Sequence, residues 1–255
     1  MEDLFDLSGK IAVVTGASSG LGVEFAKALA ARGADIAIVA RRMEKLAETQ
    51  KMIEKMGRKC LALKCDVLKV AEVKKTVATI KKHFGRIDIL VNNAGVAKAR
   101  PSHEHPDEDW HVVVDTNLTS VFYMCREVGK IMIKQNYGKI INLGSIHSHV
   151  AMHGLPLTAY CASKGGVLML TKALASEWAK HHITVNAIAP SYFPSEMTGA
   201  VIDTPDFKQV LQAYCPMGRV GNPAELSGAL IYFASDASSF TTGQILAIDG
   251  GWTTI

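Results

Sequence analysis

Residues 11–22 read IAVVTGASSGLG, a continuous apolar run that leads directly into a glycine-rich turn. An amphipathic pattern typical of a helix begins near Val23. Glycines in such a turn let backbone N–H groups approach a pyrophosphate, and the dipole of the following helix favours the same anion. A glycine-rich turn alone is weak evidence, but its place between the first strand and the first helix predicts a dinucleotide site. Its predicted contacts are Gly16, Ser18, Ser19, Gly20, Leu21 and Gly22.

Short apolar runs alternate with longer amphipathic stretches along the whole chain. The runs are residues 11–15, 36–40, 60–65, 87–91, 139–144, 183–189 and 244–249, and the stretches are residues 23–32, 43–56, 70–84, 110–135, 165–181 and 223–234. Continuous apolar strands indicate a sheet covered on both faces, and strand–helix alternation indicates parallel βαβ units. We therefore predict an α/β fold: one doubly wound Rossmann-type domain over residues 1–255, with about seven parallel strands. Residues 191–216 are expected to form two short helices, either as a lid or as part of the core.

The end of the second predicted strand distinguishes between two dinucleotides. An NAD site places Asp or Glu there, about 20 residues past the glycines, whereas this chain has Ala40 followed by Arg41 and Arg42. Two guanidinium groups would bind a 2′-phosphate, so the sequence favours NADP(H), with NAD possible, unless the arginines are only a solvated face. Asp66 and Val67 end the third strand, where Asp66 either accepts a hydrogen bond from the adenine amino group or caps the next turn.

Residues 160–164 read YCASK and open the amphipathic stretch that follows. Tyr160 and Lys164 are four residues apart, so they share one helix face. A lysine ammonium beside a phenol would lower the phenol pKa and make it a usable acid at neutral pH. We expect Lys164 to act on Tyr160 in this way.

Five motifs occur in a fixed order: TGASSGLG at 15–22, NNAG at 92–95, DTNL around Asn117, Ser145 after KIINLG, and YCASK. Together they resemble the short-chain dehydrogenase/reductase family, over essentially the whole chain. The resemblance implies hydride transfer between NADP(H) and a secondary alcohol or ketone. It implies that Tyr160 is the general acid or base, that Lys164 also holds the nicotinamide ribose, and that Ser145 binds the substrate oxygen. Asn117 would bind a water that leads protons from Lys164 to solvent.

The same resemblance suggests further cofactor contacts. Asn93, Ala94 and Gly95 would either face the cofactor, with the backbone at Gly95 close to the adenosine, or serve only the fold, while Asn92 ties strands together. Pro190, Ser191 and Ser195 would lie near the nicotinamide, although Ser191 replaces the family's usual glycine, so a residue suited to positive φ is lost. Fourteen residues separate Ser145 from Tyr160, more than is usual, so either this loop is longer or Ser148 takes the serine's role.

The charge and the hydropathy of the chain exclude two classes of partner. The net charge is +4 and no basic block occurs, which argues against nucleic acid, and no run of 18 apolar residues predicts a membrane span. Five cysteines without a CxxC pair are expected to be reduced thiols in a cytoplasmic protein. Three histidines in the loop before Tyr160 are expected to line a polar pocket or the surface rather than bind a metal. The resemblance further implies a homotetramer, in which the two longest amphipathic stretches would pack between subunits or only cover the sheet.

The substrate class is less defined. The DGGW ending after a YFPSEM-type segment resembles gluconate 5-dehydrogenase-like members of the family, which implies a sugar acid. Hydroxysteroid dehydrogenases and 3-oxoacyl-carrier-protein reductases share all five motifs. A non-catalytic dinucleotide-binding regulator is the alternative from another functional class. A lyase or epimerase would need further acid–base groups.

Overall fold

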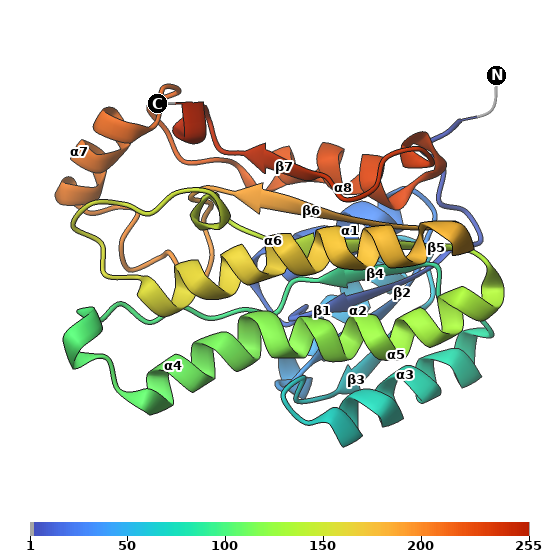
Figure 1. The fold of residues 1–255 in the computed structure, drawn as a ribbon. Coiled ribbons are helices and arrows are strands. Elements are labelled where there is room, and N and C mark those ends of the chain that lie inside the picture. Colours follow the sequence, from blue (N-terminus) through green and yellow to red (C-terminus); the bar gives the residue numbers. More distant parts are fainter. Residues whose placement is uncertain (1–2, 255) are drawn as a thin grey trace.

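The computed structural model describes residues 3–254 and contains one seven-stranded parallel sheet (Figure 1). The strand order is β3-β2-β1-β4-β5-β6-β7. The strands are β1 (Ile11–Thr15), β2 (Asp35–Ala40), β3 (Cys60–Lys64), β4 (Ile89–Asn92), β5 (Gly138–Leu143), β6 (Ile183–Pro190) and β7 (Ile245–Ile248). The helices are α1 (Gly20–Ala31), α2 (Met43–Lys55), α3 (Val70–Phe84), α4 (Asp107–Val114), α5 (Ser120–Gln135), α6 (Thr158–Trp178), α7 (Pro205–Tyr214) and α8 (Ser227–Ala234).

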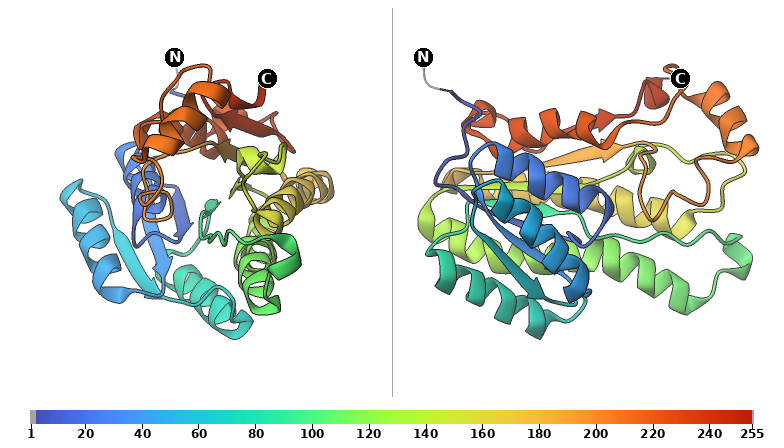
Figure 2. Two further views of the ribbon diagram at one scale, coloured as in Figure 1. Left: turned by 90° about the vertical axis from the view of Figure 1, so that its left-hand side faces the viewer. Right: turned by 180° about the vertical axis from the view of Figure 1, so that it is seen from behind.

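Two apolar layers enclose the sheet. Helices α1, α2 and α8 cover one face through side chains such as Phe25, Leu46 and Phe233, and α3, α5 and α6 cover the other through side chains such as Ile80 and Val128. Figure 2 shows the two groups of helices on opposite sides of the strands. Because successive strand residues point to opposite faces, both layers draw on the same continuous apolar runs. The predicted doubly wound fold is confirmed.

The position of the site follows from the strand order. The chain passes from β1 outward through β2 and β3, and then returns to place β4 on the other side of β1. At this reversal the connections on the two sides diverge and leave a crevice beyond the carboxyl ends of the strands. The glycine-rich turn after β1 and the residues after β4 both lie there.

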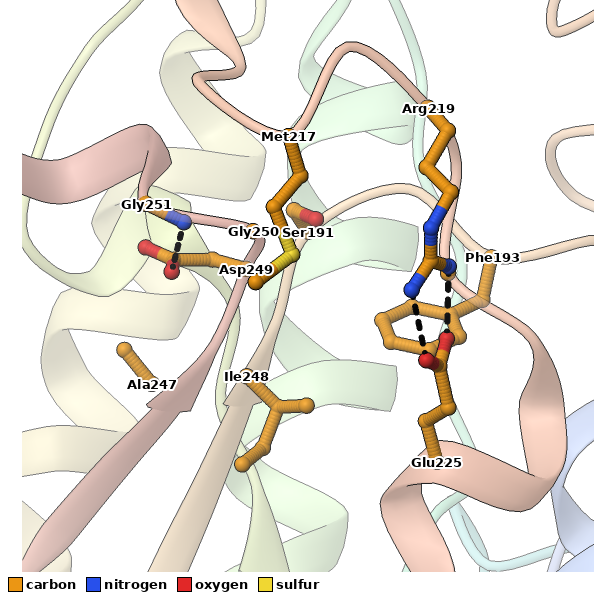
Figure 3. Close-up of a pocket in the computed structure, with 11 residues that line it drawn as sticks. Ser191, Phe193, Met217, Arg219, Glu225, Ala247, Ile248, Asp249, Gly250 and Gly251 are labelled. Carbon is orange, nitrogen blue, oxygen red and sulfur yellow. Dashed lines mark hydrogen bonds and ion pairs between the residues drawn. The ribbon is translucent and has the colours of Figure 1, made fainter.

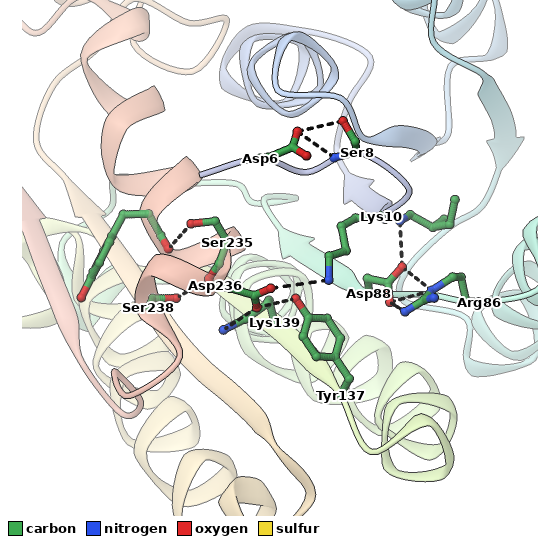
Figure 4. Close-up of polar contacts among 12 residues, drawn as sticks. Asp6, Ser8, Lys10, Arg86, Asp88, Tyr137, Lys139, Ser235, Asp236 and Ser238 are labelled. Carbon is green, nitrogen blue, oxygen red and sulfur yellow. Dashed lines mark hydrogen bonds and ion pairs between the residues drawn. The ribbon is translucent and has the colours of Figure 1, made fainter. Parts of the chain in front are cut away.

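At the amino end of the sheet, polar side chains form hydrogen bonds and ion pairs between neighbouring segments (Figure 4). Asp88, which has no exposed surface, accepts a hydrogen bond from the Ile11 backbone N–H at 2.9 Å. The Arg86 guanidinium binds the same carboxylate through Nε and Nη2, with an Nη2–Oδ1 distance of 2.7 Å. This carboxylate therefore fixes the start of β1 against the residue that precedes β4.

Two helix predictions were wrong in detail. The stretch 110–135 is not one α-helix, because a π-helical turn (Asp115–Thr119) separates α4 from α5. The segment 191–216 contains one α-helix, α7, and not the two short helices that were predicted. Its first half forms turns, and hydrogen bonds between Ser195 and Thr198 stabilise one of them. None of the helices within residues 3–254 is a candidate membrane span.

Candidate active site

Three of the predicted catalytic side chains lie beyond the carboxyl end of β5. Ser145 follows that strand, and Tyr160 and Lys164 lie in the first two turns of α6. Ser145 and Lys164 are buried, with 6% and 5% of their surfaces exposed, and Tyr160 is partly buried. The structure thus brings together a hydroxyl, a phenol and an amine that are separated by up to 19 residues in the sequence.

Ser145 and Ser148 have different surroundings. The Ser148 Oγ donates to the Lys164 carbonyl oxygen at 2.9 Å and accepts from the Ser145 backbone N–H at 3.2 Å. The Ser145 Oγ accepts from the His147 backbone N–H at 3.2 Å, and its hydroxyl also interacts with the Tyr160 phenol. Ser148 therefore holds the loop in place, while Ser145 is the serine beside the phenol.

Lys164 lies beside the Tyr160 ring but does not act on it as expected. Its Nζ is 5.7 Å from the ring centroid and donates to the Leu143 carbonyl oxygen at 2.6 Å. Burial lowers the pKa of Lys164 to about 8, because the charged form loses its hydration. The amine is held by the end of β5 rather than by the phenol.

The pKa of Tyr160 is raised, which corrects the expectation that Lys164 lowers it. Burial is the main cause, and the hydrogen-bonding interaction with Ser145 acts in the opposite direction without cancelling it. A buried phenolate lacks water, and the nearby ammonium does not compensate for this loss. Tyr160 is therefore held as a neutral phenol, the form that donates a proton.

Asn117 lies in the π-helical turn and is completely buried. Its Nδ2 donates to the Val96 carbonyl oxygen at 2.9 Å and to the Ser163 Oγ at 3.0 Å, and its Oδ1 accepts from the Val96 N–H at 2.8 Å. Both amide donors are occupied, so the side chain positions the segment after Gly95 against α6. Its role in binding a relay water stays a prediction.

The glycine-rich turn is shaped for close approach. A Cβ added at Gly22 would lie 2.4 Å from the Gly16 carbonyl oxygen, and Gly20 has φ +55°. Asn93 stabilises this turn, because its Nδ2 donates to the Thr15 carbonyl oxygen at 2.9 Å. The turn is thus a narrow backbone cradle that opens α1, as an anion site requires.

The arginine expected to bind a 2′-phosphate has an acidic partner within the chain. Arg42 donates to both carboxylate oxygens of Glu196, at 3.2 and 2.9 Å. The same guanidinium donates to the Ser19 Oγ at 2.8 Å and to the Ser18 Oγ at 3.2 Å. Arg41 is exposed. Arg42, Ser18 and Ser19 thus form a polar cluster to which a carboxylate is bound, and the contact of Arg41 and Arg42 with a 2′-phosphate stays a prediction.

The other predicted cofactor residues make contacts within the chain. Asn92 donates to the Asn142 Oδ1 at 2.9 Å, which confirms that it links β4 to β5. Asp66 accepts from the Leu68 N–H at 3.2 Å and so caps the turn. Ala94 donates its N–H to the Thr15 Oγ1, Val67 is buried, and Leu21 packs against the core.

The residue after Pro190 is not strained. Among the described residues, Asn136 and His182 are the non-glycine residues with positive φ, so Ser191 does not adopt the left-handed conformation. Its N–H donates to the Ile248 carbonyl oxygen at 3.2 Å. The missing glycine therefore carries no backbone penalty here. Ser195 lies against the glycine-rich turn, because a Cβ added at Gly20 would be 3.3 Å from the Ser195 Cβ.

The segment 191–216 packs partly on the loop after β5. Phe207 and Leu211 of α7 join Ile146 and Trp252 in an apolar cluster, and Tyr192 lies against Phe207 with ring centroids 4.6 Å apart. The pocket in Figure 3 lies at the ends of β6 and β7, next to this segment, and is lined by Ser191, Phe193, Met217, Arg219, Glu225 and Asp249 among others. None of the predicted catalytic side chains lines it, so it adjoins the site without being its centre.

His147 is one of the three histidines predicted to line a polar pocket or the surface, and its place beside the phenol could not be predicted. His147 lies edge-on to Tyr160, with ring centroids 5.9 Å apart, and its Nδ1 contacts the Val150 carbonyl oxygen at 3.1 Å. Its Nε2 is buried without a hydrogen-bond partner in the structure, and burial lowers the pKa of the imidazole. Glu196 was also missed, because it is 154 residues from Arg42 and no local pattern connects them. Among the described residues, no group of three or more His, Cys, Asp or Glu side chains could hold a metal.

Comparison with known proteins identifies the family. A family model described as enoyl-(acyl carrier protein) reductase matches residues 16–253. The chain is 41% identical to a gluconate 5-dehydrogenase of Gluconobacter oxydans (strain 621H), over 98% of this chain and 97% of that protein. It belongs to the short-chain dehydrogenase/reductase family. The predicted family is thereby confirmed.

Further short-chain dehydrogenases show how closely the fold is shared. A 2-dehydro-3-deoxy-D-gluconate 5-dehydrogenase of Bacillus subtilis (strain 168) is 40% identical, over 99% of this chain and 98% of that protein. The crystal structure of a gluconate 5-dehydrogenase from Burkholderia cenocepacia J2315 in complex with NADP and tartrate is 38% identical. It superposes with a TM-score of 0.95, covering 99% of this chain and 98% of that chain.

Proposed function

We propose that this short-chain dehydrogenase is an NADP(H)-dependent oxidoreductase that interconverts a secondary alcohol and a ketone on a sugar acid of the gluconate class. The observation that carries the proposal is the grouping of Ser145, Tyr160 and Lys164 at the crevice that the glycine-rich turn also borders. The full-length relatives named for gluconate and 2-dehydro-3-deoxygluconate support the substrate class. The family model is described as an enoyl-(acyl carrier protein) reductase, but the relatives that match over nearly their full length are named for gluconates, and we therefore place the sugar acid before an acyl thioester.

The residues of the chain fit the proposed cofactor. The glycine-rich turn is packed so tightly that a Cβ at Gly22 would clash with the Gly16 carbonyl oxygen, and Arg42, Ser18 and Ser19 offer donors suited to a 2′-phosphate. When bound, NADP(H) supplies or accepts the hydride. Lys164 would hold the nicotinamide ribose, and Pro190, Ser191 and Ser195 would lie near the nicotinamide.

In ketone reduction, we propose that the Tyr160 hydroxyl donates its proton to the substrate oxygen. The phenol is neutral because burial raises its pKa, so it carries that proton at physiological pH. The Ser145 hydroxyl donates a hydrogen bond to the same oxygen and stabilises the charge that develops there. In alcohol oxidation the reaction starts from the Tyr160 phenolate, which accepts the proton of the substrate hydroxyl and becomes the neutral phenol.

Replacing Tyr160 by Phe tests the reaction. The ring is kept and only the hydroxyl is lost, so turnover of 5-ketogluconate with NADPH should fall by at least about a hundredfold, while NADPH binding is retained. The control is Glu48→Ala, because Glu48 is exposed and lies outside the proposed proton path. Equal rates for Tyr160→Phe and the wild type would refute the mechanism. NADPH binding without turnover of any sugar acid, steroid or acyl thioester would instead favour a non-catalytic regulator.

We also propose a homotetramer in the cytoplasm. The family resemblance supports the tetramer, and the five free cysteines are compatible with a reducing compartment. Helices α5 and α6 are the proposed subunit contacts. Light scattering at micromolar concentration tests this assembly, because a monomer mass would refute it.

A further inference from the structure

The Arg42 site already binds an anion that belongs to the chain itself. The Glu196 carboxylate accepts two hydrogen bonds from the guanidinium, at 3.2 and 2.9 Å, and a third from the Ser19 hydroxyl at 2.9 Å. A planar guanidinium that grips two oxygens, together with a neighbouring hydroxyl donor, is the arrangement that also suits a phosphate. Glu196 therefore occupies the donors that a 2′-phosphate would need.

The contact joins two distant parts of the fold. Arg42 precedes α2 at the end of β2, whereas Glu196 lies in the segment 191–216. Ser195 packs on Gly20 next to it, which fixes the carboxylate over the glycine-rich turn. Both partners are partly exposed, with 42% of the Arg42 side chain and 58% of the Glu196 side chain accessible. Solvent access lets an incoming anion reach the pair and replace the carboxylate.

We propose that Glu196 is a specificity-determining residue that competes with the cofactor 2′-phosphate for Arg42, Ser18 and Ser19. The inference rests on the proposed use of NADP(H). Binding of a 2′-phosphate then requires that the carboxylate leave, whereas an unphosphorylated ribose imposes no such requirement. Glu196 thereby lowers the preference for NADP(H) over NAD(H) below the value that Arg42 alone would give.

Binding of 2′,5′-ADP and 5′-AMP, measured by calorimetry, tests the proposal without any turnover. Glu196→Gln keeps the shape of the side chain and removes its charge. Exposed ion pairs contribute little free energy, and salt screens them. This variant should therefore bind 2′,5′-ADP about threefold to tenfold more tightly, and the gain in affinity should be smaller at high salt. Its affinity for 5′-AMP should change by less than about twofold. The same direction is expected for the preference of NADPH over NADH.

A matched control is available in the chain. Glu225 forms a similar exposed bidentate pair with Arg219, at 2.8 and 2.7 Å, and this pair does not involve Arg42, Ser18 or Ser19 (Figure 3). Glu225→Gln should leave the affinity for 2′,5′-ADP unchanged. In an Arg42→Met background the effect of Glu196→Gln should disappear, since the donor for which the two anions compete is gone.

Three results would overturn the inference: unchanged or weaker binding of 2′,5′-ADP by Glu196→Gln, an equal effect of Glu225→Gln, or persistence of the effect without Arg42. If Glu196→Gln loses structure by circular dichroism, Glu196→Ala is measured instead, with the same expected direction. These outcomes are separate from the proposed function. An enzyme that fails to turn over any sugar acid can still show the predicted competition, and an active enzyme can lack it.

Discussion

The Ser148 Oγ donates a hydrogen bond to the backbone carbonyl oxygen of Lys164 at 2.9 Å. This contact ties the loop after β5 to the helix that carries the phenol and the amine. The Ser148 Oγ also accepts a hydrogen bond from the Ser145 backbone N–H, and this bond fixes the position of Ser145. Its hydroxyl is thereby committed to the protein, which favours Ser145 as the serine that contacts substrate.

The first prediction separates the two serines. Ser145→Ala should lower kcat by about a hundredfold to a thousandfold, because it removes a donor to the developing oxyanion. Ser148→Ala should lower the free energy of unfolding by about 1 kcal/mol, the usual contribution of one hydrogen bond, with a smaller loss of kcat. Steady-state rates with 5-ketogluconate and urea unfolding measure the two effects. The reverse order of kcat losses would assign the substrate contact to Ser148.

The second prediction concerns the two directions of the reaction. Because burial raises the pKa of Tyr160, the phenol keeps its proton well above neutral pH. We expect kcat/KM for ketone reduction to stay flat between about pH 7 and 9, because the phenol stays protonated throughout this range. For alcohol oxidation, which needs the deprotonated phenol, kcat/KM should rise through the same range. A deuterated alcohol shows, through its kinetic isotope effect, whether hydride transfer limits the rate. If it does and kcat/KM for oxidation is still independent of pH, Tyr160 is not the base.

Local sequence patterns were sufficient to predict which segments of the chain form this site. The glycine-rich turn, the Arg42 position and the four-residue spacing of Tyr160 and Lys164 each lie within one element or one turn. Their meaning depends on short-range geometry that the sequence displays directly. The apolar runs likewise predicted each of the seven strands, with the fourth starting at Ile89 rather than two residues earlier.

Contacts between distant segments could not be predicted in this way. The Arg42–Glu196 pair, the Ser148 link to Lys164 and the carbonyl that holds the Lys164 amine depend on where loops return over the sheet. The raised pKa of Tyr160 follows from burial, which a spacing of four residues does not reveal. The π-helical turn at Asn117 was also missed, because an apolar pattern near 3.6 residues does not distinguish one extra residue per turn.

The third prediction uses Lys164 as a probe of stability. Burial lowers its pKa from 10.5 to about 8, so the unfolded chain binds more protons between these values and stability should rise with pH there. The free energy of unfolding of the wild type, relative to Lys164→Met, should therefore increase by about 2 kcal/mol between pH 7.5 and 9.5. Urea unfolding at both pH values gives this difference, and exposed Lys51→Met is the control. An unchanged difference would mean that the amine stays hydrated.

The fourth prediction concerns the amino end of the sheet, where no catalytic residue lies. Asp88→Ala removes the acceptor of the Ile11 N–H and the partner of Arg86, and it leaves a buried donor unpaired. We expect the free energy of unfolding to fall by about 1–3 kcal/mol. Asp88→Asn keeps an oxygen for Ile11 and should lose less, while Glu48→Ala on the exposed face of α2 should change it by less than about 0.5 kcal/mol. If Asp88→Ala matched Glu48→Ala in urea unfolding, the carboxylate would not be what fixes β1 beside β4.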